Sequence, residues 1–161
     1  MQIEFFEPRV IKESDLSLFA AFDCGEPILN SWLQNKCLGN GKRNASKTYV
    51  VISSDGCLAT FYCLSAHMIN HSFLKASLKR HMPDPITVLL LGRLAVDLKY
   101  QKLGLGKALV QNALQISKQV AQTIGVVGLY TYPLSEKAAN FYENRGFMQI
   151  KDDFPGMIFK L

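Results

Sequence analysis

The sequence predicts a mixed α/β domain, an α+β arrangement built on a central sheet. Two observations lead to this fold class: predicted strands lie on both sides of a strand–helix unit, and two helical segments precede them all. The chain has 161 residues, of which 48% are hydrophobic and 19% charged, as is typical of globular proteins. A chain of this length usually buries one core, so we expect a single domain over residues 1–161.

The amino-terminal part of the chain predicts two helices and a β-hairpin. "DLSLFAAF" and "EPILNSWLQNKCL" carry hydrophobic residues at i, i+3 and i+4 spacing, and "DCG" between them predicts a turn. "GNGKRNAS", residues 39–46, predicts a polar and basic loop. "KTYVVIS" and "CLATFYCLSAHMI" predict two strands joined by the turn "SDG", so we expect them to pair as a hairpin.

The remaining segments alternate between strands and helices. "HSFLKASLKRHMPDP" predicts a surface loop or short irregular helix, and "ITVLLLGRLAVD" predicts a buried central strand. "KALVQNALQISKQVAQTIG" predicts a helix that ends near Gly125. Its buried face is expected to hold Leu109, Val110, Ala113, Leu114, Ser117 and Ala121. "VVGLYTYP" predicts a strand, "SEKAANFYENRG" a helix with Ser135 as N-cap, and "FMQI" and "MIFKL" closing strands.

The composition limits the classes of protein to which the chain can belong. No segment approaches the ~20 uninterrupted apolar residues of a membrane span, and the acidic amino terminus has no signal core. We therefore expect a cytoplasmic protein that does not associate with membranes. The formal charge of +5 suits an anionic partner, either a nucleic acid or a polyphosphate cofactor. Irregular spacing predicts reduced, partly buried thiols at Cys24, Cys37, Cys57 and Cys63.

The stretch "YQKLGLGKAL" places two glycines where a strand-like run changes into a helix-like one. A helix amino terminus has several N–H groups without intrahelical partners and carries roughly half a positive charge. Gly104 and Gly106 would let the loop curl around an anion, and Gln101, Lys102 and Lys107 can add donors. A tight strand-to-helix turn without a ligand is the alternative.

Two familiar nucleotide-binding loops do not match this stretch. The dinucleotide fingerprint G-x-G-x-x-G needs a third glycine where Leu109 stands. The Walker A loop needs glycine and then Ser or Thr at the positions of Gln101 and Ala108. An anion at this loop would therefore belong to another class of ligand.

The loop matches the Q-x-x-G-x-G pattern of the GNAT acetyltransferase superfamily, at Gln101, Gly104 and Gly106. The segments "FDCGEPILNSWL", "LLLGRLAVD", "YQKLGLGKAL" and "AANFYENRGF" occur in the order seen in its toxin branch, the small acetyltransferases of bacterial toxin–antitoxin modules. Together these segments extend from Phe22 to Phe147. The sequence therefore resembles an acetyltransferase toxin over most of its length.

The resemblance implies a GNAT fold, with a mixed and mostly antiparallel sheet, a splayed strand pair and flanking helices. It also implies acetyl-coenzyme A as cosubstrate, with no metal. The backbone of Leu94, Ala95 and Val96 would face the acetyl group and pantetheine arm, where the splayed strand leaves N–H and C=O groups free, and Asn140 would bond the arm. The pyrophosphate loop would consist of Gln101, Lys102, Gly104, Leu105, Gly106 and Lys107.

The resemblance places Tyr142 near the sulfur of the coenzyme. Acetyl transfer from a thioester to an amine needs a neutral amine, a polarised carbonyl and a proton for the departing thiolate. A tyrosine, with a pKa of about 10, can supply that proton as a general acid, whereas a tyrosine buried in the core is the alternative. Asp97, Glu136 and Glu143 are candidate general bases that can equally be caps or surface charges. The amine of an aminoacyl ester is neutral enough to make a strong base dispensable.

The sequence has two groups of basic residues, which can simply be solvated surface charges. The first lies around residues 36–47, and the second includes Lys75, Lys79 and His81. In the toxin branch, similar regions hold the acceptor stem of charged tRNA. The resemblance thus implies an enzyme that acetylates the α-amino group of aminoacyl-tRNA, blocks translation, and is neutralised by a ribbon-helix-helix antitoxin. It also implies a homodimer. The tRNA-binding residues would be Lys36, Lys42, Arg43, Lys47, Arg80 and Arg93.

Two other functions stay open at this stage. A GNAT enzyme that acetylates a protein amine or a small-molecule amine shares the coenzyme loop without needing the basic groups. A nucleic-acid-binding regulator with a degenerate coenzyme site would lack the activity altogether. A metal site is not expected, because His67 and His71 have helical i, i+4 spacing in a segment that begins as a strand and offers no third ligand.

Overall fold

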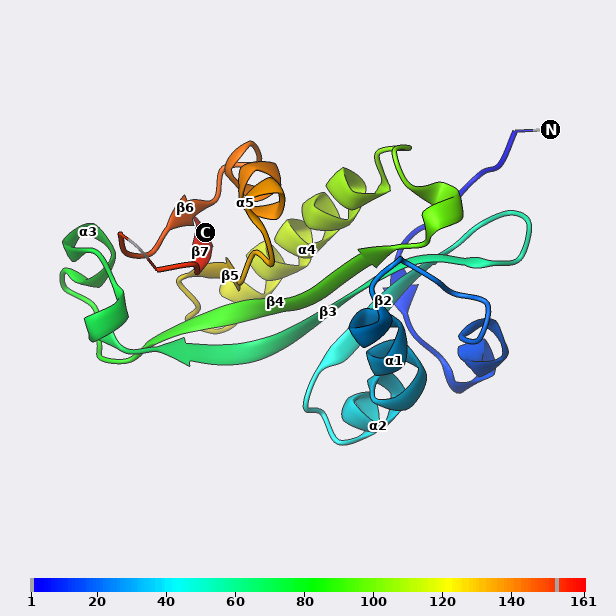
Figure 1. Cartoon of the computed structure of the whole chain (residues 1–161). Helices are drawn as coiled ribbons and strands as arrows, with labels where there is room; N and C mark the ends of the chain where they lie inside the picture. The colour runs from blue at the N-terminus through cyan, green and yellow to red at the C-terminus, as the bar shows by residue number, and fades with distance from the viewer. Residues whose placement is uncertain (1, 153) are drawn as a thin grey trace. The chain divides into compact units, whose positions relative to one another are not determined.

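The computed structural model describes every residue except 1 and 153. The chain divides into two compact units: unit 1 consists of Met1–Ser65 and Arg93–Ala113, and unit 2 of Ala66–Gly92 and Leu114–Leu161. The strands form a seven-stranded sheet in the order β1-β2-β3-β4-β5-β7-β6, with β4 in the centre (Figure 1). The β4–β5 pair is parallel, whereas β1–β2, β2–β3, β5–β7 and β6–β7 are antiparallel. The predicted mixed fold is confirmed, and the single domain over 1–161 stays a prediction.

The predicted hairpin forms the first part of the sheet. β2 (Lys47–Ile52) pairs antiparallel with β3 (Leu58–Ile69), with a register shift between Val51 and Ile52. β1 (Arg9–Val10) adds a short antiparallel strand to β2 that the sequence did not predict. Two residues are too few to show the alternation that identifies a strand.

The first predicted helix is a 3-10 helix. "DLSLFAAF" was expected to be an amphipathic α-helix, but only η1 (Glu13–Leu18) is helical, with 3-10 geometry. The chain leaves the helix because Phe19 and Phe22, which are 2% and 3% exposed, turn into the core. Burying these two rings outweighs one more turn of helix.

The second predicted helix is broken in two. α1 (Pro27–Asn35) ends before Lys36, whose φ of −123° is not helical, and α2 (Cys37–Lys42) follows directly. The loop expected over residues 39–46 is therefore wrong for its first half. Cys37 is buried and its thiol donates to the Leu33 carbonyl at 3.0 Å, which stabilises α2 despite its two glycines. Figure 1 shows α1 and α2 side by side next to β2.

An aromatic cluster forms the core of unit 1. The ring of Phe61 on β3 stacks on Trp32 of α1 with centroids 5.9 Å apart, and meets Phe22 edge-on at 5.4 Å. All three side chains are buried. The amphipathic face of α1 therefore covers this part of the hairpin, as its hydrophobic spacing predicted.

Unit 2 is built on the parallel pair of strands. β4 (Ile86–Val96) is the predicted central strand, and β5 (Gly128–Thr131) lies beside it. β7 (Met157–Lys160) pairs with β5, and β6 (Met148–Gln149) pairs with β7, which confirms the closing strands. A Cβ atom on Gly128 would lie 2.5 Å from the carbonyl oxygen of Phe159, so only glycine fits in this ladder.

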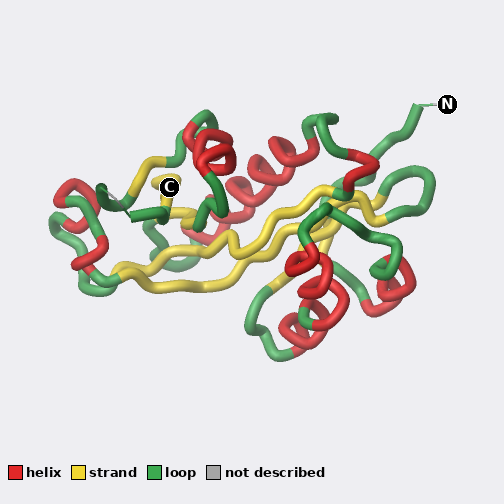
Figure 2. The backbone as a smooth tube through the Cα atoms, viewed as in Figure 1, coloured by secondary structure: helices red, strands yellow, loops and turns green. Residues whose placement is uncertain are grey.

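Three helical segments of unit 2 match their predictions. The connection between β3 and β4 contains the 3-10 helix η2 (His71–Phe73) and the single turn α3 (Ala76–Lys79), as Figure 2 shows. α5 (Glu136–Glu143) begins after Ser135, whose hydroxyl accepts the Ala138 N–H at 3.0 Å. Ser135 is therefore the predicted N-cap.

The long helix α4 (Leu105–Ala121) follows the glycine motif. Leu109, Val110, Ala113 and Ser117 on its predicted inner face are buried, while Leu114 and Ala121 are half-buried. The helix ends at Ala121, and the N–H groups of Thr123 and Ile124 both donate to the Val120 carbonyl. The stop therefore comes before Gly125.

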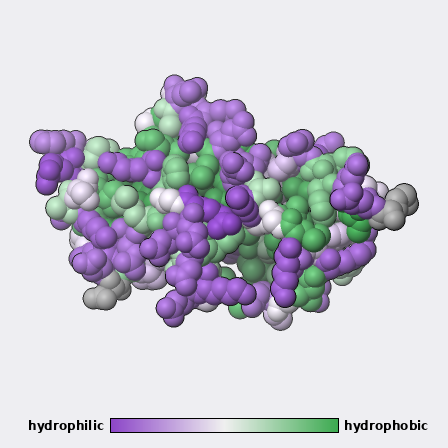
Figure 3. Space-filling model, turned by 90° about the horizontal axis from the view of Figure 1, so that it is seen from above, coloured by the Kyte–Doolittle hydropathy of each residue, from purple (hydrophilic) through white to green (hydrophobic). Residues whose placement is uncertain are grey.

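The surface is mixed in character. On the face in Figure 3, hydrophobic areas are separated by hydrophilic side chains. None of the described helices combines the length and apolarity that crossing a membrane requires. Three of the four cysteines are buried, Cys57 is half-buried, and none forms a disulfide within the described chain.

The two histidines considered as metal ligands have other neighbours. The His67 ring stacks on Tyr130, with centroids 5.6 Å apart. The His71 Nε2 atom lies 2.6 Å from the Pro83 carbonyl oxygen. Within the described residues, no three His, Cys, Asp or Glu side chains gather as a metal site.

The ion pair between Arg9 and Asp15 ties β1 to η1 and gives a stability prediction. The Asp15 carboxylate accepts two bonds of 2.8 Å from the guanidinium and one of 2.7 Å from the Lys12 N–H. These partners, Arg9 foremost, lower the pKa of Asp15. The stability gained from this shift is present above pH ~4, the usual Asp pKa, and is lost as pH falls through the lower native pKa.

Replacing Asp15 by Asn should therefore lower the unfolding free energy by about 1–3 kcal/mol at neutral pH, because the guanidinium loses its charged acceptor. Urea denaturation across pH measures this. We expect the difference from the wild type to shrink below pH ~4, where Asp15 begins to take up a proton. A difference that is equal at neutral and strongly acid pH would show that the ion pair does not stabilise the fold.

Candidate active site

The loop after β4 is held by the side chain of Gln101. Its Nε2 atom donates to the Val96 carbonyl at 2.9 Å and to the Cys24 carbonyl at 3.3 Å. Both donors of the amide are therefore used within unit 1, and the glutamine fixes the loop to the end of β4 rather than pointing into open space.

The backbone of this loop takes conformations that most residues avoid. Lys102 has a φ of +66° and Gly104 a φ of +84°. A Cβ atom on Gly104 would meet nothing within 4 Å, so crowding does not explain the glycine. The positive φ, which residues with a Cβ atom rarely adopt, does explain it. The loop turns sharply here and opens directly into α4.

The first turn of α4 offers unpaired backbone donors. The Gly104 carbonyl accepts the Ala108 N–H at 3.2 Å, the first bond of the helix. The N–H groups of Leu105, Gly106 and Lys107 lie before that bond and have no carbonyl four residues back within the helix. With the partial positive charge of a 17-residue helix, this turn suits an anion. The side chains of Lys102 and Lys107 are exposed beside it.

The end of β4 runs past its pairing with β5. The register between the two strands covers Leu89 to Leu91, and β4 continues to Val96. This is the splayed pair that the resemblance implied. The expectation that the carbonyl groups there are free is wrong at two positions, because Thr60 Oγ1 donates to the Ala95 carbonyl at 2.6 Å and Gln101 bonds that of Val96.

Asp97 anchors the segment between β4 and the loop. Its carboxylate accepts the Asp23 N–H at 3.0 Å and the Lys99 N–H at 2.9 Å, where it caps the 3-10 helix η3 (Leu98–Tyr100). Its own N–H donates to the Ala59 carbonyl at 2.9 Å. Among the candidate general bases, Asp97 is therefore a cap.

A second carboxylate, Asp55, supports the same segment from the β2–β3 turn. It accepts from Lys99 Nζ at 2.9 Å and from the Tyr100 hydroxyl at 2.8 Å, and the Ser53 hydroxyl also bonds it. These hydrogen bonds, with that of Ser53 the largest, hold the pKa of Asp55 well below its usual range. The carboxylate therefore stays charged and holds Lys99 and Tyr100, the residues just before the glycine loop.

Tyr142 lies in unit 2, on the buried side of α5. Its side chain is 8% exposed, and its ring meets Phe147 edge-on at 5.2 Å. Burial raises the pKa of Tyr142, and a hydrogen bond with the Thr131 side chain opposes that rise. The phenol therefore keeps its proton at neutral pH.

Thr131 links Tyr142 to the central strand. It is the last residue of β5 and is itself buried, and its Oγ1 atom donates to the Leu91 carbonyl at 3.1 Å. A hydroxyl proton can rotate, so the same group can also donate to the Tyr142 oxygen, and a donor there favours the phenolate and opposes the effect of burial on the pKa of Tyr142. The sequence did not single out Thr131; "GLYT" read only as a strand.

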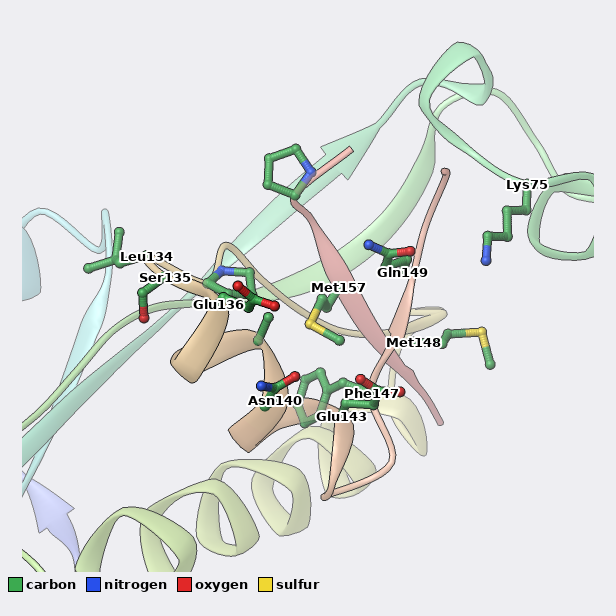
Figure 4. A pocket seen from close by; sticks show the side chains of 13 residues that line it. Lys75, Leu134, Ser135, Glu136, Asn140, Glu143, Phe147, Met148, Gln149 and Met157 are labelled. Carbon is green, nitrogen blue, oxygen red and sulfur yellow. The ribbon is translucent and has the colours of Figure 1, made fainter. Parts of the chain in front are cut away.

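Asn140 and the two candidate bases on α5 lie on the outer side of the helix. Glu136, Asn140 and Glu143 line a cavity of about 670 Å³ in unit 2, together with Phe147 and Met157 (Figure 4). Both glutamates are exposed. Asn140 therefore faces this cavity, whereas Tyr142, two residues later, is buried on the other side.

The structure thus brings the predicted residues together in two groups. The residues from 94 to 107 form one group in unit 1, joined through Gln101 and Asp97. Asn140 and Tyr142 belong to unit 2, where Thr131 completes the second group.

Comparison with known proteins identifies the family. The model of the acetyltransferase (GNAT) domain matches residues 45–149. A tRNA-acetylating toxin of Mycobacterium tuberculosis (strain ATCC 25618 / H37Rv) is 35% identical over 140 residues, which cover 87% of this chain and 82% of the toxin. The chain belongs to the GNAT acetyltransferase family.

Solved structures of GNAT toxins share the fold of this chain. AtaT complexed with acetyl-methionyl-tRNAfMet is 23% identical, with a TM-score of 0.87, covering 98% of this chain and 95% of that protein. A tyrosine-to-phenylalanine mutant of KacT is 25% identical, also with a TM-score of 0.87, covering 99% and 95%. A KacTA–DNA complex is 26% identical, with a TM-score of 0.77, covering 99% and 93%.

Three of the basic residues predicted to bind tRNA contact other side chains or carbonyl groups of the protein. Lys47 Nζ donates to the Gly41 carbonyl at 3.1 Å and to Asn44 Oδ1 at 2.8 Å, so it closes the end of α2. Lys42 pairs with Glu13 at 3.3 Å on the surface. The Arg93 guanidinium lies 4.5 Å from the centre of the Trp32 ring.

The other three predicted tRNA-binding residues are exposed. Arg43 donates to Asn40 Oδ1 at 3.2 Å, and Lys36 begins the step between α1 and α2. Arg80, which is in unit 2, follows α3. Lys36 and Arg43 therefore flank α2, of which Lys42 is the last residue, whereas Arg80 belongs to unit 2.

Replacing Thr131 by Val should raise the pKa of Tyr142 further, because it removes the hydrogen bond that opposes the effect of burial. Difference absorbance of the phenolate during an alkaline titration, variant against wild type, measures the shift. The Thr131→Ser variant keeps the hydroxyl and should titrate as the wild type does. Identical titration of the Val variant and the wild type would remove Thr131 as the partner of Tyr142.

Proposed function

We propose that this chain is an acetyl-coenzyme A-dependent N-acetyltransferase that acetylates the α-amino group of an aminoacyl-tRNA and thereby blocks translation. The observation that carries the proposal is the 35% identity to a tRNA-acetylating toxin over 87% of the chain. Membership of the acetyltransferase family supports the reaction class. The net charge of +5 supports a polyanionic acceptor in the cytoplasm, where charged tRNA is found.

The loop and the end of β4 fit acetyl-coenzyme A, which would supply the acetyl group as an activated thioester. The pyrophosphate would bind the N–H groups of Leu105, Gly106 and Lys107, with the ammonium groups of Lys102 and Lys107 nearby. The open space at Gly104 supports this fit. A structure of AtaTR bound with AcCoA, 24% identical with a TM-score of 0.77, supports it by analogy.

The other coenzyme-binding residues have distinct roles. Leu94, Ala95 and Val96 would present their remaining backbone groups to the acetyl group and pantetheine arm, and Asn140 would bond the arm. Gln101 would act through its hold on the Val96 carbonyl, so it positions the loop and does not itself contact phosphate. Its role would therefore be to hold the end of β4 and the loop before α4 in a fixed position relative to each other.

Tyr142 would act as the general acid. When the bond between acetyl group and sulfur breaks, the thiolate needs a proton, and the Tyr142 hydroxyl would donate it. Its raised pKa keeps that proton in place at neutral pH. Thr131 would stabilise the phenolate that remains after the proton has left, because its hydroxyl can turn from the Leu91 carbonyl and donate to the Tyr142 oxygen.

The amine needs little help to become neutral. The α-amino group of a peptide has a pKa of about 7.7–8.0, and esterification of the neighbouring carboxyl lowers the pKa further. With Asp97 used as a cap, and Glu136 and Glu143 exposed on the outer side of α5, we propose that no dedicated base is required. The rate should then rise with pH until the free amine is fully deprotonated.

For the acceptor stem, we propose Lys36, Arg43, Arg80 and Arg93 as the primary phosphate contacts. Lys42 and Lys47 would contribute after releasing their partners Glu13 and Gly41. Such contacts release counterions, so binding should weaken steeply with salt.

Complexes of related toxins suggest binding partners for this chain. AtaT has been solved bound to the C-terminus of the antitoxin AtaR, and KacTA in complex with DNA. We propose that a ribbon-helix-helix antitoxin neutralises this chain and that the enzyme works as a homodimer.

The decisive experiment combines the protein with labelled acetyl-coenzyme A and a pool of charged tRNAs. Nuclease digestion and mass analysis of the aminoacyl-adenosine ends then locate the label. We expect an acetyl group on the α-amino nitrogen. Label on proteins or small amines alone would establish the other acetyltransferase function and refute the tRNA proposal.

Replacing Tyr142 by Phe removes the proton donor while preserving the ring. We expect kcat to fall about 10²–10⁴-fold with an unchanged fold, since this is the usual contribution of general acid catalysis. Single-turnover acetylation of charged tRNA measures it. Tyr49→Phe, at a half-buried tyrosine stacked on Tyr62, is the matched control and should keep full activity. Full activity in the Tyr142 variant would exclude the assigned role.

Alanine variants of two glycines with nearly the same φ can distinguish an effect of backbone strain from an effect on coenzyme binding. Gly104 and Gly56 have φ of +84° and +83°, and neither has a neighbour that would crowd a Cβ atom. Alanine at either should lower the unfolding free energy by about 1–2 kcal/mol. Only Gly104→Ala should weaken acetyl-coenzyme A binding, roughly tenfold, as calorimetry can measure. Equal affinity in both variants would exclude the loop as the pyrophosphate site.

A further inference from the structure

A row of aromatic rings leads from the core of unit 2 to its surface. The rings of Tyr130 and Tyr132 are 5.0 Å apart, those of Tyr132 and Phe154 are 6.1 Å apart, and those of Phe154 and Phe73 are 5.2 Å apart. Tyr130 is buried, whereas Tyr132 is 47% and Phe73 is 41% exposed. The row therefore has a fixed inner end and an exposed outer part.

Two loop segments hold the row in shape. The Lys75 N–H donates to the Ile150 carbonyl at 2.6 Å, and Lys151 Nζ donates to the Ser72 carbonyl at 2.8 Å. Gly156 packs so closely that a Cβ atom on it would lie 2.4 Å from the Tyr130 hydroxyl. Hydrogen bonds thus join the segment next to Phe154 to the segment that carries Phe73.

The row lies on the opposite face of β5 from Tyr142. Neighbouring side chains on a strand point to opposite faces, so Tyr130 and Thr131 face apart. Thr131 faces Tyr142, and Tyr132 contacts Tyr130 on the other face. In a direct transfer, donor and acceptor reach the acetyl group from different sides. Tyr142 therefore does not occupy the aromatic face of β5, and Tyr132 is exposed there.

Cationic side chains accompany the rings. Lys75, Lys79 and Arg80 belong to the same segment as Phe73, and Lys151 adjoins it through Ser72. Their excess of positive charge complements phosphate, although Asp152 lies 3.8 Å from Lys75 Nζ. Exposed aromatic rings beside cations are the arrangement that binds single-stranded nucleic acids, where bases stack on the rings and phosphates meet the charges.

We propose that Tyr132, Phe154 and Phe73 form a stacking platform for an unpaired nucleobase at the 3′ end of the acceptor RNA. This inference rests on the proposed function. The amino acid of a charged tRNA is esterified to the ribose of its last, unpaired nucleotide. A base stacked on this platform would hold that ribose, and with it the amine, on the acceptor face of β5.

The test compares two stable substrates that differ only in the base. One is an amino acid joined by an amide to 3′-amino-3′-deoxyadenosine, and the other carries the same amino acid on the aminosugar without adenine. We expect the wild type to prefer the adenine-bearing substrate about tenfold or more in kcat/KM, as for one stacked base. Tyr132→Leu and Phe154→Leu should each lose most of this preference, whereas Tyr132→Phe should keep it.

A matched control is Phe6→Leu, which removes an exposed ring in unit 1 and should leave the preference intact. Equal rates of the wild type on the two substrates, or turnover of charged tRNA with turnover of neither small substrate, would overturn the inference. A preference that survives both leucine substitutions would overturn it as well. Failure to acetylate charged tRNA at all would refute the proposed function instead.

Discussion

The hold of Gln101 on the end of β4 is the interaction on which the site depends. A central strand that outruns its neighbour exposes backbone groups that must find partners. Here Thr60 and Gln101 bond the carbonyls of Ala95 and Val96, and the next N–H, that of Asp97, bonds the Ala59 carbonyl. With these groups satisfied by the protein, the strand stays extended without a second partner strand. The same glutamine fixes the loop from which α4 begins.

β5 divides the chemistry of unit 2 between its two faces. On one face, Thr131 connects the hydroxyl of Tyr142 to the Leu91 carbonyl of the neighbouring strand. On the other face, Tyr130 supports a row of rings that ends at the surface. In the proposed acetyl transfer, Tyr142 would serve the departing thiolate from one face, and the acceptor would arrive at the other face. Strand alternation provides this division through consecutive residues.

Sequence periodicity and capping residues predicted the elements whose formation depends on nearby residues. The hairpin, the central strand, the Ser135 cap and the buried face of α4 all follow from periodicity and capping. The break at Lys36 and the strand β1 did not, because they depend on burial of Cys37 and on pairing with β2. The residues of the candidate site were taken from a resemblance in motifs, and their roles stay a prediction. Thr131 was missed because its role arises from contacts across strands and not from its sequence neighbours.

Amide hydrogen exchange with and without acetyl-coenzyme A tests the central claim most directly, namely that the end of β4 and the start of α4 form one coenzyme surface. The account predicts slower exchange at residues 94–96 and 104–107 when the coenzyme is bound, with no change in the β2–β3 turn at 53–56. The first set should respond together, because Gln101 joins its two halves. Tight binding of the coenzyme without protection of these amides would contradict the account.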